Sequence, residues 1–425
     1  MKILVVGNGG REHAIIWKLL QSSKVDKIYC TIGNAGINKI AEPVNIKPTD
    51  IRALIDFVKH NGIGYTVVGP EVPLAEGIVD EFIKERLKIF GPSKSAARLE
   101  NSKVFAKDFM RRGNIPTAKF QSFSSEEKEG AINYINESKF PVVIKADGLA
   151  AGKGVIIAGD KQAALDSLNE FFDNKIFGEA GDNIVIEEFL TGVEASVFAV
   201  CDGENYVVLP SAQDHKKIGN GEQGKNTGGM GSFAPADKIV KPEVMQRVKE
   251  KIIEPVLKNM KAEGAEFKGC LYCGLMIDEY GEPFVIEFNT RFGDPETQVV
   301  LPLVKSDLLD MFIASSEGKI SGYKLETYNE YYACVVMASK GYPDEYETGK
   351  EIEGLEKVGD DCIVFHAGTK LSNAGNVITT GGRVLNVVTK SKNNLKFAIN
   401  KAYEAVKKIS FENEYYRTDI GKKGL

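Results

Sequence analysis

The sequence predicts a protein of three parts: an α/β part with a parallel sheet, an α+β part, and a small β-rich part. Two observations lead to this fold class. The chain has 425 residues, whereas a single hydrophobic core rarely serves more than about 250–300 residues. The hydrophobic pattern also changes along the chain, from alternating strands and helices to short strands. We place the domains at residues 1–102, 103–322 and 323–425.

The first part shows the βαβ pattern of a parallel, Rossmann-like sheet with helices on both faces. The predicted strands are Lys2–Val6, Lys27–Thr31, Gly64–Val68 and Lys88–Phe90, and the predicted helices are Arg11–Gln21, Asp50–Asn61 and Leu74–Glu85. Ligands of such sheets bind beyond the carboxyl ends of the strands. We therefore expect one crevice between the loops Gly7–Gly10, Gly33–Gly36 and Gly69–Leu74.

The loop after the first strand is suited to a phosphate. Val5–His13 has the pattern of a strand, a glycine turn and a helix start, so backbone N–H groups would point at a bound anion. A dinucleotide fingerprint would need its third glycine where Glu12 stands, which disfavours a nicotinamide cofactor.

The second part begins with a strand that carries Lys145 into a glycine-rich loop, residues 147–154. Glycines let a backbone approach phosphates closely and lysines neutralise them, so we expect nucleotide phosphates here; a flexible surface turn is the alternative. The next predicted strand, Asn183–Phe189, is followed by Glu194. We predict that Glu194 accepts hydrogen bonds from a ribose, although acids at strand ends are often plain solvated charge.

Glu287, Asn289 and Arg291 are the sharpest local signal. Residues two apart on a strand share a face, so these three should emerge together while Ile286 and Phe288 face the core. Magnesium prefers such oxygen ligands together with nucleotide phosphates, and arginine can bind a substrate carboxylate. An exposed polar strand face is the alternative.

The segment Gln213–Lys217 brings a carboxylate and ammonium groups close to the stretch Ile218–Gly231. We interpret this stretch as a glycine-rich loop, and we expect His215 to be structural.

Cys270 and Cys273 have zinc-like spacing, but the sequence has no second ligand pair to complete a zinc site. We therefore interpret these cysteines as buried strand residues.

The third part contains short strands and one closing helix. The predicted strands are Tyr331–Ser339, Cys362–Thr369, Val377–Thr379 and Arg383–Thr389, and the predicted helix is Asn393–Lys408.

Composition narrows the function classes. A formal charge of −5, from 59 acidic and 54 basic residues, gives no electropositive field for nucleic acid. Six scattered cysteines and a start without a signal-peptide pattern favour the cytoplasm, and no apolar run approaches the length of a membrane span. We expect a monomer that acts on small molecules.

The glycine loop, the Lys145 strand, the Glu187–Leu190 segment and the Glu287/Asn289 pair occur in the order found in ATP-grasp carboxylate–amine ligases. Within that superfamily the chain resembles the glycinamide ribonucleotide synthetase family in six motifs. The motifs are Gly7–Ala14, Val68–Leu74, Ile144–Gly154, Gln213–Lys216, Asn226–Gly231 and Glu287–Asp294. The resemblance implies that the second part is an ATP-grasp domain, with a mobile lid at about residues 124–190 and the 218–231 loop closing with it.

The resemblance also implies the roles of particular residues. ATP contacts are implied at Lys103, Lys145, Gly152, Glu187, Glu188, Leu190 and Glu194, and magnesium or manganese ligands at Glu287 and Asn289. Substrate contacts are implied at Gly9, Gly10, Asn34 and Glu71 for phosphoribosylamine and at Asp214 and Arg291 for glycine. Lys216 is a further implied substrate contact, and Asp214, Arg291 and Lys145 are the implied catalytic residues. Lys217 departs from the arginine usual in the family, so no role is assigned to it.

The implied reaction is the ATP-dependent ligation of glycine to 5-phosphoribosylamine through glycyl phosphate, in de novo purine biosynthesis. Alternatives are another ATP-grasp carboxylate–amine ligase, a biotin carboxylase-like enzyme, a nucleotide-binding regulator without catalysis, and a nicotinamide oxidoreductase. The sequence lacks both a G-x-S-x-G motif and a local Cys/His signature, so an acyl-enzyme has no evident carrier.

Overall fold

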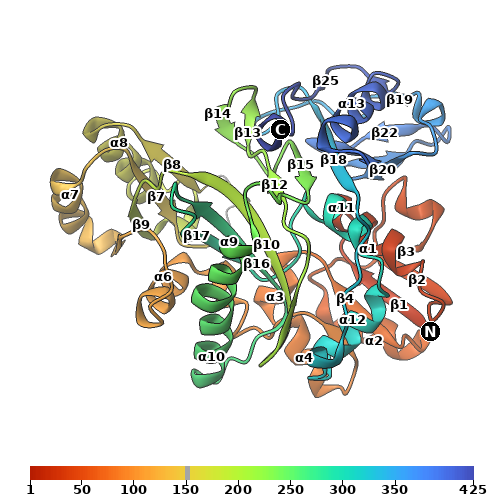
Figure 1. Cartoon of the computed structure of the whole chain (residues 1–425), viewed down its shortest axis with the longest axis horizontal. Helices are drawn as coiled ribbons and strands as arrows, with labels where there is room; N and C mark the ends of the chain where they lie inside the picture. Colours follow the sequence, from red (N-terminus) through yellow and green to blue (C-terminus); the bar gives the residue numbers. More distant parts are fainter. Residues whose placement is uncertain (149–153) are drawn as a thin grey trace.

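A computed structural model describes residues 1–148 and 154–425 (Figure 1). The amino-terminal region is a parallel sheet in the order β3-β2-β1-β4-β5. Its strands are β1 (Lys2–Val6), β2 (Lys27–Thr31), β3 (Glu42–Val44), β4 (Tyr65–Val68) and β5 (Ile89–Phe90). Its helices are α1 (Gly10–Leu19), η1 (Ile37–Lys39), α2 (Ile51–Asn61), α3 (Glu71–Glu76) and α4 (Ile78–Lys84). The predicted parallel sheet is confirmed.

Two details of this region differ from the prediction. The helix expected at Leu74–Glu85 is divided into α3 and α4 at Gly77, whose φ of +95° is outside the helical range and favours glycine. The edge strand β3 was not predicted, because a three-residue strand containing Pro43 lacks a hydrophobic pattern.

The second region contains two antiparallel sheets. One projects from the rest of the molecule at the left of Figure 1, has the strand order β6-β9-β7-β8, and is covered by α7 and α8. Its elements are β6 (Phe120–Ser124), η2 (Ser125–Glu127), α7 (Lys128–Glu137), β7 (Val142–Ala146), β8 (Val155–Ala158), α8 (Lys161–Phe172), η3 (Gly178–Gly181) and β9 (Asn183–Glu188). The preceding helices are α5 (Arg98–Asn101) and α6 (Lys103–Arg112).

The other sheet of this region has the order β11-β10-β16-β17. Its strands are β10 (Val193–Asp202), β11 (Tyr206–Val208), β16 (Lys268–Ile277) and β17 (Pro283–Asn289), and the helices before β16 are α9 (Pro242–Val248), the π-helix η4 (Lys249–Ile253) and α10 (Glu254–Ala262). β16 and β17 are antiparallel neighbours in this sheet. Cys270 and Cys273 are buried and unpaired in β16, as expected.

A bulge in β17 changes the predicted side-chain pattern. Glu287 pairs with Gly274 and Val285 with Leu275, so Ile286 is left over in the register. Both Val285 and Phe288 consequently enter the core, whereas Ile286 is half-buried. The prediction that Ile286 faces the core was wrong, but Glu287 and Asn289 remain two residues apart beyond the bulge and share a face.

The carboxyl-terminal region is built on the sheet β12-β15-β18-β23-β20, with β25 also paired to β18. Its strands are β18 (Tyr331–Ser339), β20 (Cys362–His366), β23 (Arg383–Ser391) and β25 (Glu414–Tyr415), joined by β12 (Gln213–Asp214) and β15 (Gly231–Ala234) from the middle of the chain. Smaller elements are β19 (Ile352–Glu353), η7 (Leu355–Lys357), β21 (Thr369–Leu371), β22 (Val377–Thr379), α13 (Leu395–Val406), β24 (Ser410–Phe411) and η8 (Lys422–Gly424). This sheet thus ties the second region to the third.

The stretch Ile218–Gly231 is not a plain loop. It contributes to a hairpin of β13 (Lys217–Gly219) and β14 (Gln223–Asn226), and its end forms β15. Its glycines and polar residues concealed the pairing, because they lack the alternating hydrophobic pattern of a typical strand.

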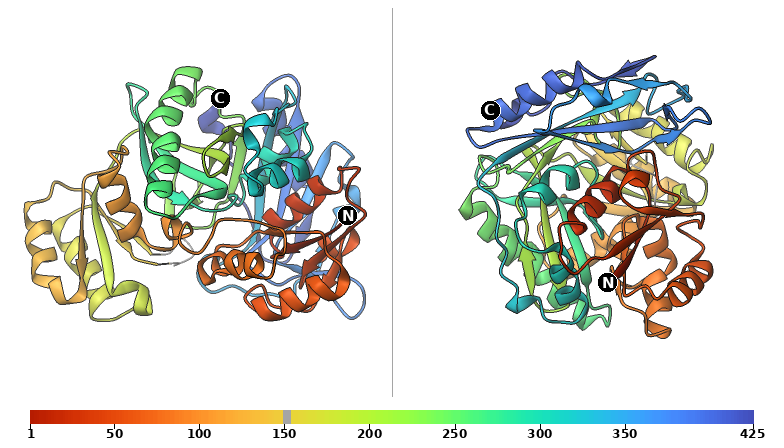
Figure 2. Two further views of the ribbon diagram at one scale, coloured as in Figure 1. Left: turned by 90° about the horizontal axis from the view of Figure 1, so that it is seen from below. Right: turned by 90° about the vertical axis from the view of Figure 1, so that its right-hand side faces the viewer.

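One hydrophobic core joins the regions. Helices α11 (Thr297–Val300), η5 (Leu301–Leu303), α12 (Leu308–Ser316) and η6 (Ile320–Gly322) lie between the amino-terminal sheet and the rest, as Figures 1 and 2 show. The fully buried Phe312 of α12 stacks on Phe90 of β5 with ring centroids 4.0 Å apart, and Phe292 lies 5.8 Å away. The amino-terminal sheet and the second region therefore share one buried core.

Across the described residues, no helix is both long and apolar enough to cross a membrane. The mixed α/β and α+β class predicted from the sequence is confirmed, while the domain limits at 102/103 and 322/323 stay a proposal.

We expect Phe312→Ala to lower the free energy of unfolding by about 3–5 kcal/mol, because it leaves a cavity between two regions. Urea unfolding followed by tryptophan fluorescence and circular dichroism measures the change. Phe397→Ala is the control: this phenylalanine is 51% exposed on α13, and its loss should cost less than about 0.5 kcal/mol. Equal effects of the two substitutions would contradict the shared core.

Candidate active site

The carboxylate of Glu287 lies at the centre of a positively charged cluster. Burial raises its pKa, but three surrounding ammonium groups outweigh that effect and hold the pKa below its ordinary value; they belong to Lys216, Lys145 and Lys103. In residues 1–148 and 154–425, no side chain hydrogen-bonds to Glu287 or forms an ion pair with it. An ionised carboxylate without a direct partner is available to a cation, and its neighbour Asn289 adds an amide oxygen on the same face.

Lys145 and Glu187 contact each other inside a buried network. The Lys145 ammonium lies 2.9 Å from Glu187 Oε1 and donates to the Ile286 carbonyl at 3.0 Å. Lys107 Nζ lies 2.8 Å from Glu187 Oε2, and burial lowers the pKa of Lys107 to about 8 despite the attraction of Glu187. This network has a third member, Lys107, which sequence reasoning missed because a lysine in an amphipathic helix resembles any solvated lysine.

The half-buried Lys216 and the buried Asp214 form a second ion pair beside Glu287. Lys216 Nζ donates to both carboxylate oxygens, at 3.1 and 3.0 Å. The carboxylates of Asp214, Glu194 and Glu287 raise the pKa of Lys216 well above its ordinary value against the effect of burial. Burial also raises the pKa of Glu194. The structure therefore brings these predicted residues to one place.

Arg291 joins the end of β17 to the amino-terminal region. Its guanidinium donates to Asn289 Oδ1 at 3.2 Å and lies 2.8 Å from Glu100 and 3.4 Å from Glu71. Arg291 and Arg11 hold the pKa of Glu71 at about 2, in spite of its burial. Glu100 was missed by the sequence analysis, since a single acid in a short helix carries no pattern.

The glycine loop of the first strand is tightly packed. Gly9 is the N-cap of α1 and its N–H donates to Glu12 Oε2 at 2.6 Å, while a side chain at Gly10 would collide with Asn386 and Gln298. Asn34 donates to the carbonyls of Asn8 and His366, and its Oδ1 accepts from the backbone of residues 36 and 37. Asn34 therefore braces the loop against the carboxyl-terminal region, and its contact with substrate stays a prediction.

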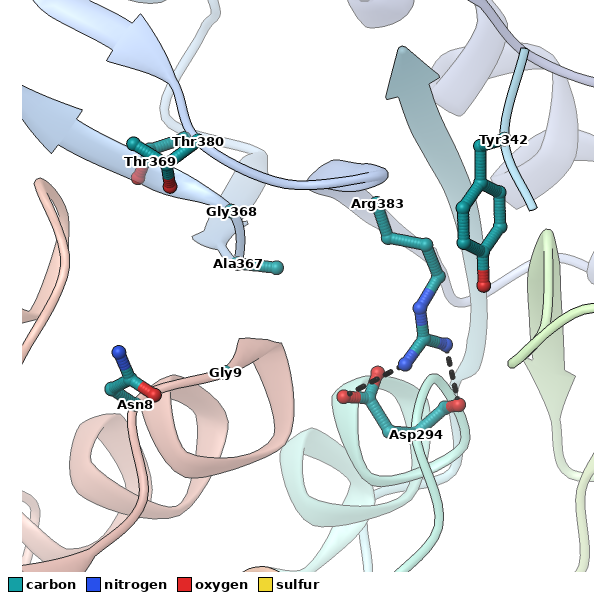
Figure 3. Close-up of a pocket in the computed structure, with 9 residues that line it drawn as sticks. All are labelled: Asn8, Gly9, Asp294, Tyr342, Ala367, Gly368, Thr369, Thr380 and Arg383. Atoms are coloured by element: carbon teal, nitrogen blue, oxygen red, sulfur yellow. Dashed lines mark hydrogen bonds and ion pairs between the residues drawn. The ribbon is translucent and has the colours of Figure 1, made fainter. Parts of the chain in front are cut away.

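A cavity of about 290 Å³ opens beside this loop (Figure 3). Asn8 and Gly9 line it from the amino-terminal region, and the carboxyl-terminal region contributes most of the opposite wall. The remaining lining residues are Asp294, Tyr342, Ala367, Gly368, Thr369, Thr380 and Arg383. Arg383 lies 3.3 Å from the Asp294 carboxylate and donates to the Asp294 carbonyl at 2.7 Å, which closes one side of the cavity. Its polar lining is suited to a hydroxylated anion.

Of the other residues named from the sequence, Glu188 and Leu190 lie at the edge of the site. Glu188 is exposed and accepts from the Lys119 backbone at 3.0 Å, and Leu190 is half-buried just beyond β9. Gly152 lies outside the described residues. His215 is buried, and burial lowers its pKa to about 4; it accepts from the Gly421 backbone at 3.2 Å, in agreement with a structural role.

Comparison with protein families identifies the three regions. Residues 1–100, 101–297 and 332–423 match the N domain, the ATP-grasp (A) domain and the C domain of phosphoribosylglycinamide synthetase. The chain belongs to the phosphoribosylglycinamide synthetase family. The resemblance inferred from the six motifs is thereby confirmed, and so is the ATP-grasp assignment of the second region.

Individual members of this family match along their full length. A phosphoribosylamine–glycine ligase of Caldanaerobacter subterraneus subsp. tengcongensis is 50% identical over 420 residues, which are 99% of each chain. The crystal structure of the Thermotoga maritima phosphoribosylamine–glycine ligase is 33% identical, with a TM-score of 0.82 over 99% of this chain and 100% of that one. A Campylobacter jejuni biotin carboxylase complex shares the fold alone, with 17% identity and a TM-score of 0.74 over 98% and 92% of the two chains.

Two histidines connect helix α1, which follows the glycine loop, to the C domain. His13 Nδ1 accepts from the His366 backbone at 2.8 Å, and His366 Nδ1 lies 3.1 Å from Thr369 Oγ1 beside the cavity. Burial and the mutual proximity of the rings lower the pKa of His13 to about 3, and burial lowers that of His366 to about 4. Both are neutral at pH 7.

We expect the protein to lose stability as the pH falls from about 6.5 to 4. The unfolded chain binds protons at these histidines in that range and the folded chain does not, so acid favours unfolding by an amount on the order of 3 kcal/mol for His13. His13→Gln keeps an acceptor for the His366 N–H and should reduce the loss, measured by urea unfolding at pH 7 and pH 4.5. His60→Gln is the control: His60 is exposed on α2, so this substitution should leave the acid-induced loss of stability unchanged. A smaller loss in His60→Gln than in His13→Gln would contradict the role given to His13.

Proposed function

We propose that this protein joins glycine to 5-phosphoribosylamine with the conversion of ATP to ADP and phosphate, and so forms glycinamide ribonucleotide in de novo purine biosynthesis. It is a carbon–nitrogen ligase. The observation that supports this most directly is the Glu287 carboxylate, which is surrounded by lysines and has no direct ion-pair partner among residues 1–148 and 154–425, in a chain that matches the family over its full length. Such a cluster suits a triphosphate with a divalent cation.

The residues at the end of β17 fit a divalent metal ion. Glu287 and Asn289 offer two hard oxygen ligands on one face, and the cluster of His, Cys, Asp and Glu that an all-protein cage would need is not found in the described residues. Magnesium suits such a partial site, because it commonly keeps only one or two protein ligands and takes the rest from phosphates and water. We propose magnesium; when bound there, it would neutralise charge on the ATP phosphates.

The lysines act on the phosphate that is transferred. We propose that Lys103, Lys145 and Lys216 stabilise the negative charge that develops when a glycine carboxylate oxygen attacks the γ-phosphorus and ADP leaves. Glycyl phosphate results, and the amine of phosphoribosylamine then attacks its carbonyl carbon, loses a proton and expels phosphate. Positioned charges can carry both steps without a covalent enzyme intermediate.

We propose that glycine lies between Asp214, Lys216 and Arg291, and that phosphoribosylamine occupies the cavity beside Gly9. The volume of about 290 Å³ and the hydroxyl, amide and guanidinium groups of the lining support a sugar phosphate there. The glycine loop and the start of α1 offer backbone N–H groups to its phosphate.

Water must be kept from glycyl phosphate, which it would hydrolyse. We propose that residues of about 124–190, together with the 218–231 hairpin, close as a lid over the nucleotide. Lys145 already links this sheet to β17 through the Ile286 carbonyl, so lid position and lysine position are coupled. We further propose that the protein acts as a cytoplasmic monomer, which its unpaired cysteines are compatible with.

Glu287→Ala should lower the rate of ADP formation by about 100-fold or more, because it removes the carboxylate at which metal and phosphates meet. The assay measures ADP release that depends on both glycine and freshly prepared phosphoribosylamine. Glu279→Ala is the matched control, since Glu279 is an exposed acid in the turn of the same hairpin. Near-normal turnover by Glu287→Ala would remove the proposed metal site, and ADP release without either substrate would contradict the ligase assignment.

A further inference from the structure

Glu296 is a buried carboxylate next to the lysine cluster around Glu287. The reaction described above gives Glu296 no role. It lies between β17 and α11 and is only 3% exposed. Its Oε1 accepts hydrogen bonds from Tyr272 Oη at 3.0 Å and from Ser196 Oγ at 3.3 Å. Gly293 makes room for the other oxygen, because a Cβ on residue 293 would lie 2.5 Å from Glu296 Oε2.

The surroundings of Glu296 leave its charge without a direct partner. Within the described part of the chain, no cationic side chain forms an ion pair with Glu296, and no other residue donates a hydrogen bond to Oε2. The backbone N–H of Glu296 itself also hydrogen-bonds to its carboxylate. Burial and the neighbouring Asp214 carboxylate raise its pKa to about 7, which Lys216 offsets only in part. The more remote guanidinium groups that face it are those of Arg291 and Arg383.

We propose that Glu296, together with Asp214, binds the α-ammonium group of glycine. The proposal rests on the ligase function above and assigns a substrate-binding residue within the same site. Two neighbouring carboxylates repel each other in the free enzyme, and a cation between them removes that repulsion. Glycine offers one cation only, its ammonium group, while its carboxylate is directed toward the lysines and the ATP phosphate.

The arrangement also meets a chemical requirement of the reaction. The glycine amine must stay protonated while its carboxylate is activated, since a neutral amine on one glycine could attack another glycyl phosphate. Two anionic oxygens around the ammonium favour its charged form. Tyr272 and Ser196 hold Glu296 through Oε1, so Oε2 is the oxygen left for the substrate.

Glu296→Gln tests this assignment, because glutamine keeps an oxygen for Tyr272 and Ser196 and removes the charge. We expect the KM for glycine at pH 8 to rise about 10- to 100-fold, as for the loss of one charge-assisted hydrogen bond, while the KM for ATP changes little. The substitution also removes repulsion with Asp214, so the melting temperature should stay equal or rise. A merely structural role would lower the melting temperature and leave the glycine KM in place.

The pH dependence provides the second readout. In the unsubstituted enzyme the glycine KM should rise as the pH falls through about 7, because Glu296 takes up a proton and loses its attraction for the ammonium group. Glu296→Gln should lack this inflection. Glu330→Gln is the matched control: Glu330 is likewise buried and accepts from a tyrosine, Tyr332, at 3.2 Å, but lies away from the cluster.

The outcomes separate this inference from the function on which it rests. If the unsubstituted enzyme forms no ADP with glycine and phosphoribosylamine, the proposed function fails. If it does, and Glu296→Gln keeps the glycine KM and its pH profile, the Glu296 assignment is overturned. Should Glu296→Gln not fold, Glu296→Asp is the second variant, because it retains the charge but moves the carboxylate away from the substrate. Its KM for glycine should rise, and the dependence of that KM on pH should be preserved. An unchanged KM for glycine would overturn the proposal equally.

Discussion

The compensation of buried lysine charge at the end of β17 is the constraint on which the rest of the structure depends. Ammonium groups lose hydration when they are buried, and this loss must be balanced by nearby anions. Glu187 forms ion pairs with Lys107 and Lys145, and Asp214 forms one with Lys216. Among the described residues, Glu287 lies near several of these lysines without a direct ion-pair partner. The cluster therefore leaves one carboxylate available to a cation.

Ion pairs also connect the regions that surround the candidate site. Arg291 connects β17 to Glu71 and Glu100, so the crevice of the amino-terminal sheet and the end of the central sheet keep a fixed relation. The carboxyl-terminal sheet includes β12, on which Asp214 lies, and its residues Thr369 and Arg383 line the cavity opposite Gly9. All three regions thus contribute to one site, and none of them could form it alone.

The fold and the centre of the site could be predicted where local rules decide. The parallel sheet could be predicted because its apolar strands are followed by glycines. The shared face of Glu287 and Asn289 could be predicted because alternate residues of a strand point to the same side. The position of Ile286 could not be predicted, because the bulge depends on the register with β16. Lys107, Glu100 and Glu296 have roles only through contacts with residues distant in sequence, and the pairing of β13 with β14 was hidden by polar, glycine-rich sequence.

The most direct test is a crystal structure with magnesium and a non-hydrolysable ATP analogue. The account predicts a metal ion at about 2.0–2.1 Å from oxygens of Glu287 and Asn289 that would also bind phosphate oxygens of the analogue, with Lys145 and Lys216 turned toward the γ-phosphate. A triphosphate bound elsewhere, with these two residues free of metal, would contradict it.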